Sequence, residues 1–552
     1  MTPQELLRPR NARVLLGLAL AASGVLLIAW QSHLTFLIDD WDLLLYRRGF
    51  NAHALLDPHA RHLIIGPALV YKAIQATFGM DRYTPYGAVA TATFLASVAV
   101  LYVYLRRRVG DWVALAAVLP ILVMGSAYED LLAAFQINYF GSMAFGIGAL
   151  LAIERADDRG DAFACVLLVA SLAFAEIAVA FAAGIAVAIA LQRGPLRRAW
   201  VVAVPILLYA IWYPTFGSGA DVGPSSFSLH NVATSPPYVL DGFASSAGSL
   251  LGLGTPLLFG GSGGLEWGRP VLVALVAVSI AWVFRARPAQ RWWVLVPLAV
   301  GLAFWFLTAA NFDIGRSPSA SRYQYVGAVF LLMIAAQLAA GWRPGWRGVV
   351  AVLAVGIAAA LGNLAMLHDG YRAVKSLSIV VRGGLAGLDI TADRVRPDLK
   401  LTRENSDVDY FTLLEAGPYL SAADKYGSPA YTQEELVTAP EPARVAADKV
   451  MAAALPIALR PGPVPSAGCT SVGGTGAGAG TPVVSLPPGG AGLIAPGTAG
   501  ASLTLRRYAG DSFPVSPGVL HGQARLVIPT DRSSRPWQLK VDAPGPVRVC
   551  RL

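Results

Sequence analysis

Long apolar runs separated by short loops fill the first two thirds of the chain, up to about residue 367. A helix rises about 1.5 Å per residue, so a run of about 20 residues is long enough to cross the hydrocarbon core of a bilayer. Charged residues make up 14% of the 552 residues, and the mean hydropathy is +0.54. Soluble domains carry about 25% charged residues. The sequence therefore predicts a polytopic membrane protein.

We expect about eleven transmembrane helices. The first follows Arg8, Arg10 and Arg13 and runs from Val14 as far as Ile38. The segment 162–191 is too long for one crossing and predicts two short helices, whereas 63–78 is short and polar enough to predict a helix on the membrane surface. The other expected spans are apolar runs bounded by short loops: 85–105, 112–125, 139–153, 199–213, 270–284, 292–310, 323–340 and 348–367.

Arginines gather in the loops that this count places inside, at positions 106–108, 193, 197, 198, 285, 287, 291, 343 and 347. The outer loops 125–138 and 215–267 contain no Lys or Arg, although the first outer loop is basic. Since Lys and Arg favour cytoplasmic loops, the N-terminus is expected in the cytoplasm of a bacterial plasma membrane, with the C-terminal region outside. The net charge of +9 is therefore an orientation signal, and nucleic-acid binding is excluded because no basic groove with aromatics is present.

The region after residue 367 has an ordinary soluble composition. We expect a linker with helical patches over 368–462, including a helix over 441–455, and a small β-sandwich over 463–552. The expected strands alternate polar and apolar residues between turn residues: 481–486, 501–506, 523–528, 537–541 and 547–551. A disulfide between Cys469 and Cys550 would close a long loop and would form only in an oxidising compartment. Two unrelated thiols are the alternative.

Three carboxylates fall within four residues at the expected outer end of the first span: Asp39, Asp40 and Asp42. If the helix continues, Asp39 and Asp42 share one face. Close carboxylates repel, so one holds its proton more tightly and can act as a general base toward a hydroxyl. They could instead bind a divalent cation that neutralises a phosphate leaving group. The plain alternative is a solvated helix end, or ion pairs with Arg47 and Arg48.

A second acidic pair, Glu129 and Asp130, begins the next outer loop. Acids often stabilise a helix N-terminus, but two acidic loops on one side of the membrane indicate a shared site. Arg316 and Arg322 also fall on an outer loop, against the usual bias. Arg binds phosphate through parallel charge-assisted hydrogen bonds, so a lipid phosphate would explain them. Pairing with Asp313 or with lipid headgroups would also explain them.

Histidines gather in the first outer loop, at positions 33, 53, 59 and 62. His59 and His62 are three residues apart, but no cysteine or tight ligand spacing supports a zinc site. Hydrogen bonding to a substrate, or simple solvation, accounts for them better. The candidate substrate-binding residues are His62, Glu176 and Tyr323.

In their order and their membrane side, these motifs resemble the GT-C superfamily of membrane glycosyltransferases. That superfamily includes protein O-mannosyltransferases, aminoarabinose transferases and actinobacterial arabinofuranosyltransferases. The matching features cover the first 340 residues: the acidic motif after the first helix, the long first outer loop, the second acidic pair, Phe174-Ala175-Glu176-Ile177 and Ser321-Arg322-Tyr323. The family's recurrent Lys-Glu motif has Ala175 in place of the lysine.

The resemblance implies a GT-C-like fold and transfer of a sugar from a polyprenyl phosphate to an extracytoplasmic glycan, lipid or protein. It implies that Asp39 or Asp40 is the base. Glu129 and Asp130, with Asp42, would assist it or hold Mg²⁺, Mn²⁺ or Ca²⁺. Under the same resemblance, the arginines at positions 316 and 322 would hold the donor phosphate.

The high Ala, Gly and Arg content is typical of an actinobacterium, in which such enzymes build cell-wall or surface glycans, and the β-rich end resembles the carbohydrate-binding domains attached to some of them. No Walker or Rossmann glycine motif occurs, so no nucleotide is expected. A transporter or flippase of lipid-linked glycans and a non-catalytic envelope scaffold are the alternative functions.

Overall fold

The computed structural model describes residues 8–59, 62–192, 194–219, 227–254, 264–285, 292–312, 316–408, 414–465, 468–472, 483–495 and 500–551. The chain forms two compact units. The first holds Met1–His33, Arg47–Ile74 and Thr84–Val374, and the second holds Leu34–Tyr46, Gln75–Tyr83 and Lys375–Leu552. Two short segments from the N-terminal part of the sequence therefore belong with the C-terminal region.

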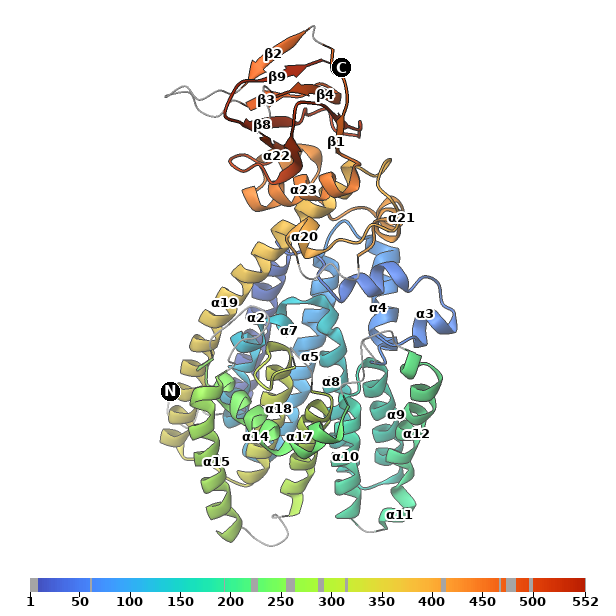
Figure 1. The fold of residues 1–552 in the computed structure, drawn as a ribbon. Coiled ribbons are helices and arrows are strands. Elements are labelled where there is room, and N and C mark those ends of the chain that lie inside the picture. The colour runs from blue at the N-terminus through green and yellow to red at the C-terminus, as the bar shows by residue number, and fades with distance from the viewer. Residues whose placement is uncertain are drawn as a thin grey trace. The chain divides into compact units, whose positions relative to one another are not determined.

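The first unit is built from helices, coloured blue to yellow in Figure 1. Their bounds are α2 Pro9–Gln31, α3 Ala52–Leu56, α4 Ile65–Phe78, α5 Thr84–Val109, α6 Asp111–Val118, α7 Tyr128–Leu132, α8 Ile137–Ile153, α9 Asp158–Phe174, α10 Ile177–Ala190, α11 Pro195–Arg198, α12 Trp200–Thr215, α13 Leu229–Ala233, α14 Ser235–Leu250, α15 Leu265–Arg285, α17 Leu295–Ala310, α18 Ser321–Leu338 and α19 Trp346–Ile390. The ends of α4 and α19 continue into the second unit.

Several helices have the length and composition of membrane spans. Within the described residues there are five, or six if a bent pair counts as one span. The five are Pro9–Gln31, Thr84–Val109, Ala134–Ile153, Trp292–Ala310 and Trp346–Ile390. The bent pair joins Asp111–Val123 to Gly125–Leu132 at 44°, because the backbone at Met124 is extended. These helices confirm the prediction of a multi-pass membrane protein. The expected number of eleven transmembrane helices stays a prediction.

Two predicted helix boundaries are wrong. The first helix ends at Gln31 rather than at Ile38, so Asp39 and Asp42 do not share the face of a continuous helix. The last apolar run does not end near residue 367 but continues as one helix to Ile390. The split of 162–191 is confirmed, because α9 ends at Phe174 and α10 begins at Ile177.

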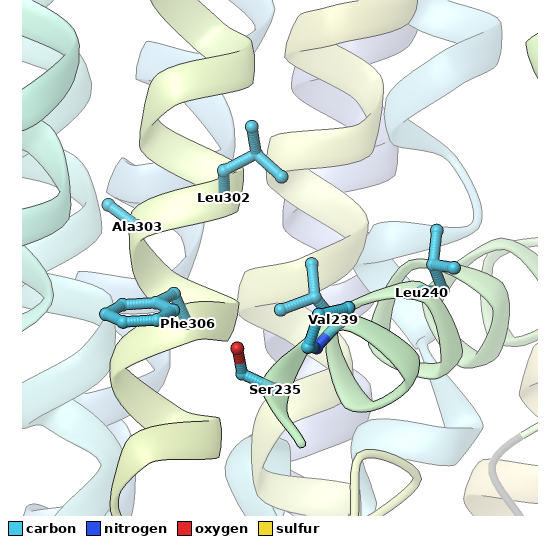
Figure 2. A pocket seen from close by; sticks show the side chains of 7 residues that line it. Ser235, Val239, Leu240, Leu302, Ala303 and Phe306 are labelled. Carbon is cyan, nitrogen blue, oxygen red and sulfur yellow. The ribbon is translucent and has the colours of Figure 1, made fainter. Parts of the chain in front are cut away.

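An open, apolar groove of about 580 Å³ lies between α14 and α17 of the first unit. Figure 2 shows Val239 and Leu240 on α14, with Leu302 and Phe306 on the neighbouring α17. Leu240, Leu302 and Phe306 are all exposed. The groove therefore offers a hydrocarbon-lined surface on the outside of the helical unit.

The second unit contains helices α20 Arg403–Ser406, α21 Ala416–Tyr426, α22 Gln433–Thr438 and α23 Glu441–Ala454, followed by two antiparallel sheets. One sheet has the order β1-β7-β4-β9-β2 and the other β3-β8-β5-β6. The strands are β1 Ala458–Pro461, β2 Cys469–Val472, β3 Val483–Ser485, β4 Gly489–Ile494, β5 Ala501–Arg506, β6 Val515–Leu520, β7 Gln523–Ile528, β8 Gln538–Asp542 and β9 Val547–Cys550. Side chains from both sheets share one apolar core.

The predicted C-terminal β region is confirmed, and four strands that the sequence did not predict complete it: β1, β2, β4 and β6. Residues 481 and 482 of one expected strand lie outside the described residues, as do Arg193, Arg287 and Arg291 of the expected inner loops. The predicted helix near 441–455 is α23, which has a proline in its first turn as helix N-termini favour.

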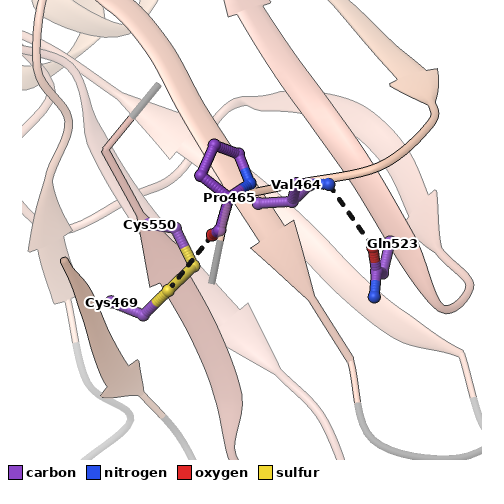
Figure 3. Close-up of a disulfide and its surroundings, with 5 residues drawn as sticks. All are labelled: Val464, Pro465, Cys469, Gln523 and Cys550. Carbon is purple, nitrogen blue, oxygen red and sulfur yellow. Dashed lines mark hydrogen bonds between the residues drawn. A yellow bond between two sulfur atoms is a disulfide. The ribbon is translucent and has the colours of Figure 1, made fainter. Parts of the chain in front are cut away.

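The predicted disulfide is confirmed. Cys469 on β2 stands directly opposite Cys550 on β9, and their sulfur atoms are bonded (Figure 3). Cys165, on α9, is buried and not bonded to another cysteine. A loop of 81 residues is closed by the disulfide, which corresponds to a stabilisation of about 4 kcal/mol if the effect is the lost entropy of the unfolded chain.

Helix α23 is tied to the sheets by a buried carboxylate. Asp448 accepts hydrogen bonds from the backbone N–H groups of Arg507, Tyr508 and Ala509 at 2.7–3.1 Å. Burial nevertheless raises the pKa of Asp448 to about 6, the hydrogen bonds opposing it. The three bonds fix the end of β5 on the helix.

Candidate active site

The second acidic pair packs against the start of α18. Glu129 and Asp130 lie in the first turn of α7, and the Glu129 backbone N–H donates to the Ser321 hydroxyl at 3.3 Å. Asp130 is fully buried, and within the described residues neither of its carboxylate oxygens has a hydrogen-bond partner. Glu129 and Arg322 lie within electrostatic range of it. A buried carboxylate without hydrogen bonds is costly, so Asp130 is a candidate functional residue.

Tyr139, in the first turns of α8, connects this acidic pair to the other predicted residues. It lies within electrostatic range of Tyr323, Arg322, Asp130 and Glu176. Residues from four separate stretches of the sequence are therefore gathered at one place in the first unit. Tyr139 was not among the predicted site residues, although its position nine residues after Asp130, at the start of the next helix, was a usable signal.

Glu176 holds His62 in a fixed orientation. One oxygen of Glu176 lies 2.6 Å from Nδ1 of His62, and the other accepts the backbone N–H of Leu63 at 3.0 Å. Glu176 occupies the turn between α9 and α10, where Ala175 is extended. The ring of Phe174, two residues before Glu176, packs directly against Gly141. A Cβ at position 141 would come within 2.2 Å of this ring, so only glycine fits there. The close packing of Phe174 on Gly141 therefore fixes the turn that carries the Glu176 carboxylate.

The contact with Glu176 determines the tautomer of His62. A carboxylate only accepts hydrogen bonds, so Nδ1 carries the proton in the neutral ring and Nε2 is left as the acceptor. The side chain of His62 is 45% exposed. Of the other predicted histidines, His59 pairs with His62 through its backbone, and its ring packs at a tilt against Phe135 with ring centroids 4.9 Å apart.

The backbone of Arg316 is hydrogen-bonded to α14, one of the two helices that line the apolar groove. The Tyr238 hydroxyl donates to the carbonyl oxygen of Arg316 at 2.6 Å, and Tyr238 directly precedes the groove residue Val239 on α14. Tyr238 lies within electrostatic range of Arg316, Arg322 and Tyr323. Both arginines therefore lie near Tyr238 on α14, the helix that also carries the groove residues Val239 and Leu240, and the Arg316 guanidinium donates to the carbonyl oxygen of Asn311 at 3.2 Å. Asp313, the expected alternative partner of these arginines, lies outside the described residues.

The first acidic motif belongs to the second unit. Asp39 and Asp40 lie in the turn that follows α2, and Asp42 begins a short π-helix, Asp42–Tyr46. Asp40 is 1% exposed, and its carboxylate accepts the backbone N–H of Leu37 at 2.8 Å. Asp39 is half-buried. The two candidate bases therefore differ: Asp40 is enclosed and holds the turn, whereas Asp39 is the more accessible.

A metal ion was a further expectation for the acidic residues. Across the ranges that the structure describes, no three His, Cys, Asp or Glu side chains converge. Mg²⁺ is often held by one or two carboxylates together with substrate phosphate and water. A cation at Glu129 and Asp130 would therefore need oxygen atoms from the substrate to complete its coordination, and a metal ion at this site stays a prediction.

Comparison of the sequence with models of protein families gives no match, and comparison with curated proteins gives none. Among solved structures, the chain is similar to ArnT from Cupriavidus metallidurans, crystallised with undecaprenyl phosphate bound. The TM-score is 0.44 and the identity 13%, over 75% of this chain and 88% of ArnT. A likeness at this level decides neither family nor chemistry, which the residues themselves must support.

Proposed function

We propose that this protein is a membrane glycosyltransferase that moves a sugar from a polyprenyl phosphate to an external hydroxyl acceptor. One observation carries the proposal: Arg316 and Arg322 lie near α14, which lines an apolar groove, and Arg322 lies within electrostatic range of the buried Asp130, all in one compact unit. A polyprenyl phosphate has an anionic head on a long hydrocarbon tail. Adjacent cationic and hydrocarbon-lined surfaces are what such a molecule requires.

In this proposal Arg322 and Arg316 bind the phosphate, and the groove between α14 and α17 holds the first part of the polyprenyl chain. The bond between the anomeric carbon and the phosphate oxygen breaks during transfer. Its electron pair remains on the phosphate, so negative charge increases there. Guanidinium groups that are already in place stabilise that charge as it develops.

Asp39 is the proposed general base. It takes the proton of the acceptor hydroxyl, whose oxygen then forms the new bond to the anomeric carbon. We prefer it to Asp40 because Asp40 is 1% exposed whereas Asp39 is half-buried. His62, with Nδ1 held by Glu176, is proposed to accept a hydrogen bond from a sugar hydroxyl at Nε2.

The proposal is tested with the purified full-length protein in lipid vesicles and a panel of synthetic polyprenyl-phosphate monosaccharides. Alkyl glycosides and cell-wall glycan fragments serve as acceptors. We expect release of polyprenyl phosphate and a new glycosidic bond for at least one pair of substrates. Movement of the intact lipid-linked sugar between leaflets, without cleavage of its phosphate bond, would instead identify a flippase.

Arg322→Gln is expected to raise the KM for the lipid-linked donor by about 10- to 100-fold. The variant removes a charge-assisted hydrogen bond, worth roughly 1.5–3 kcal/mol, while leaving a neutral donor. Initial rates at varied donor concentration measure the effect. Arg343→Gln is the matched control, because Arg343 lies on an exposed loop and contacts only backbone carbonyls in the described residues. Equal donor KM values for the two variants would contradict the role of Arg322.

Ala303→Trp is expected to weaken binding of a long polyprenyl phosphate but not of methyl phosphate, which has no polyprenyl chain. Ala303 lines the groove, and an indole there would displace hydrocarbon from it. Excluding two methylene groups from an apolar surface costs about 1.6 kcal/mol, or roughly 15-fold in affinity. Competition of each phosphate against the labelled donor measures the difference. If both ligands weaken equally, or neither does, the tail does not lie in this groove.

A further inference from the structure

The first acidic motif folds as part of the C-terminal region. Segments 34–46 and 75–83 join residues 375–552 in one compact unit. The backbone N–H of Thr35 donates to the Ser378 hydroxyl at 3.3 Å, and that of Met80 donates to the carbonyl of Tyr426 at 2.6 Å. The conformation of the acidic turn is therefore determined by contacts with residues far along the chain.

Buried aromatic rings make the main connection. Trp41, between Asp40 and Asp42, is 1% exposed and packs edge-on against Tyr419 of α21, with ring centroids 6.1 Å apart. Phe36 packs against Trp41 at 5.7 Å and against Tyr83 at 5.3 Å. Edge-on aromatic pairs add to the free energy of burial and favour one geometry. The indole of Trp41 is thus held between its own loop and α21.

Tyr419 is itself fixed. Its ring is fully buried, and its hydroxyl lies 2.8 Å from the Ser428 hydroxyl, which donates to Asp389 at 2.6 Å. Asp389 is one residue before the end of α19. The position of the Tyr419 ring therefore follows from the junction of α19 and α21.

The acidic turn also contains strained backbone. Ile38 has a φ of +30°, although β-branched residues strongly avoid positive φ. Such strain costs about 1–3 kcal/mol and persists only where the surrounding structure enforces it. The Asp40 carboxylate, hydrogen-bonded to the Leu37 N–H, and the buried Trp41 indole follow the strained residue and help to hold it.

We infer that Tyr419 of α21 is a positioning residue that holds the acidic turn, and with it Asp39, in the conformation used for transfer. The part of this inference that concerns activity rests on the proposed function. The part that concerns the conformation of the acidic turn does not. It assigns to the C-terminal region a part in fixing the conformation of the acidic turn, in addition to any role in binding glycan.

The test uses Asp39→Cys in the full-length protein and a membrane-impermeant maleimide. The other three cysteines do not interfere, because Cys469 and Cys550 form the disulfide and Cys165 is buried. Adding Tyr419→Leu is expected to raise the labelling rate about tenfold, since the loss of one aromatic contact and its packing frees the turn. Adding Tyr419→Phe, which keeps the ring, is expected to leave the rate within about twofold.

Val541→Ala is the matched control. It makes a cavity in the apolar core of the same unit without touching α21, and the labelling rate is expected to stay unchanged. Equal labelling with Tyr419→Leu and Val541→Ala, or no increase with Tyr419→Leu, overturns the inference. In the Asp39 background, kcat should fall about tenfold in Tyr419→Leu with the donor KM unchanged. If the wild-type protein transfers no sugar, the proposed function fails while the labelling result still decides this inference.

Discussion

Replacing Asp39 by Asn should lower kcat for sugar transfer by about 10³-fold, because general-base catalysis by a positioned carboxylate contributes 10²–10⁴-fold. Asn has nearly the shape of Asp but cannot take the proton of the acceptor hydroxyl. The donor KM should change little, since the proposed phosphate ligands are Arg316 and Arg322 and not this carboxylate. Single-turnover transfer from a radiolabelled polyprenyl-phosphate sugar, with saturating acceptor, measures the chemical step directly.

Two neighbouring substitutions distinguish a base from a structural acid. Asp42→Asn should retain most of the activity, because Asp42 begins the π-helical turn that follows the proposed base and is not assigned a proton-transfer role. Asp40→Asn should lower activity together with thermal stability, because the Asp40 carboxylate holds the Leu37 N–H in a buried turn. Full activity of Asp39→Asn, or an equal loss in Asp42→Asn without loss of stability, would exclude Asp39 as the base.

The helices could be predicted from the sequence because apolar runs of membrane length have few other solutions. Their ends were less predictable. The sequence predicts a first helix as far as Ile38 because the residues after Gln31 are mostly apolar, but those from Leu34 onward fold into the second unit. Strands β4 and β6 were missed because Gly489, Gly490 and Pro517 have the composition of turns. The glycine at position 490 is required there, since a Cβ would come within 1.9 Å of a carbonyl on β7.

The predicted residues at the candidate site were chosen by residue type and expected side of the membrane. The structure brings Glu129, Asp130, Arg322, Tyr323 and Glu176 into one electrostatic neighbourhood. The sequence could not reveal the pairing of His62 with Glu176, because 114 residues separate them. Nor could it reveal that the acidic turn depends on α21. Contacts between residues so far apart in the sequence depend on how the whole unit packs, and no local sequence pattern indicates them.

Asp531→Asn should destabilise the C-terminal sheets by about 3–5 kcal/mol, because it leaves a buried guanidinium without its counter-charge. The side chains of Arg507 and Asp531 are 7% and 0% exposed and lie 2.6 Å apart. Hydrogen exchange of β5 and β8 amides in the full-length protein measures the loss. Arg532→Gln is the matched control: Arg532 pairs with Asp393 at the surface, with both side chains more than half exposed, so the cost should be below about 1 kcal/mol.

Combining Asp531→Asn with Arg507→Met separates the charge from the packing. The loss of stability in Asp531→Asn is attributed to an unpaired buried charge. Removing that charge should therefore restore about 2 kcal/mol of the free energy of unfolding, since apolar replacements of buried ion pairs are often tolerated. Recovery should be incomplete because Arg507 also donates to the carbonyls of Arg535 and Ser533. A double variant less stable than Asp531→Asn alone would show that Arg507 stabilises the sheets through these backbone contacts and not through its ion pair.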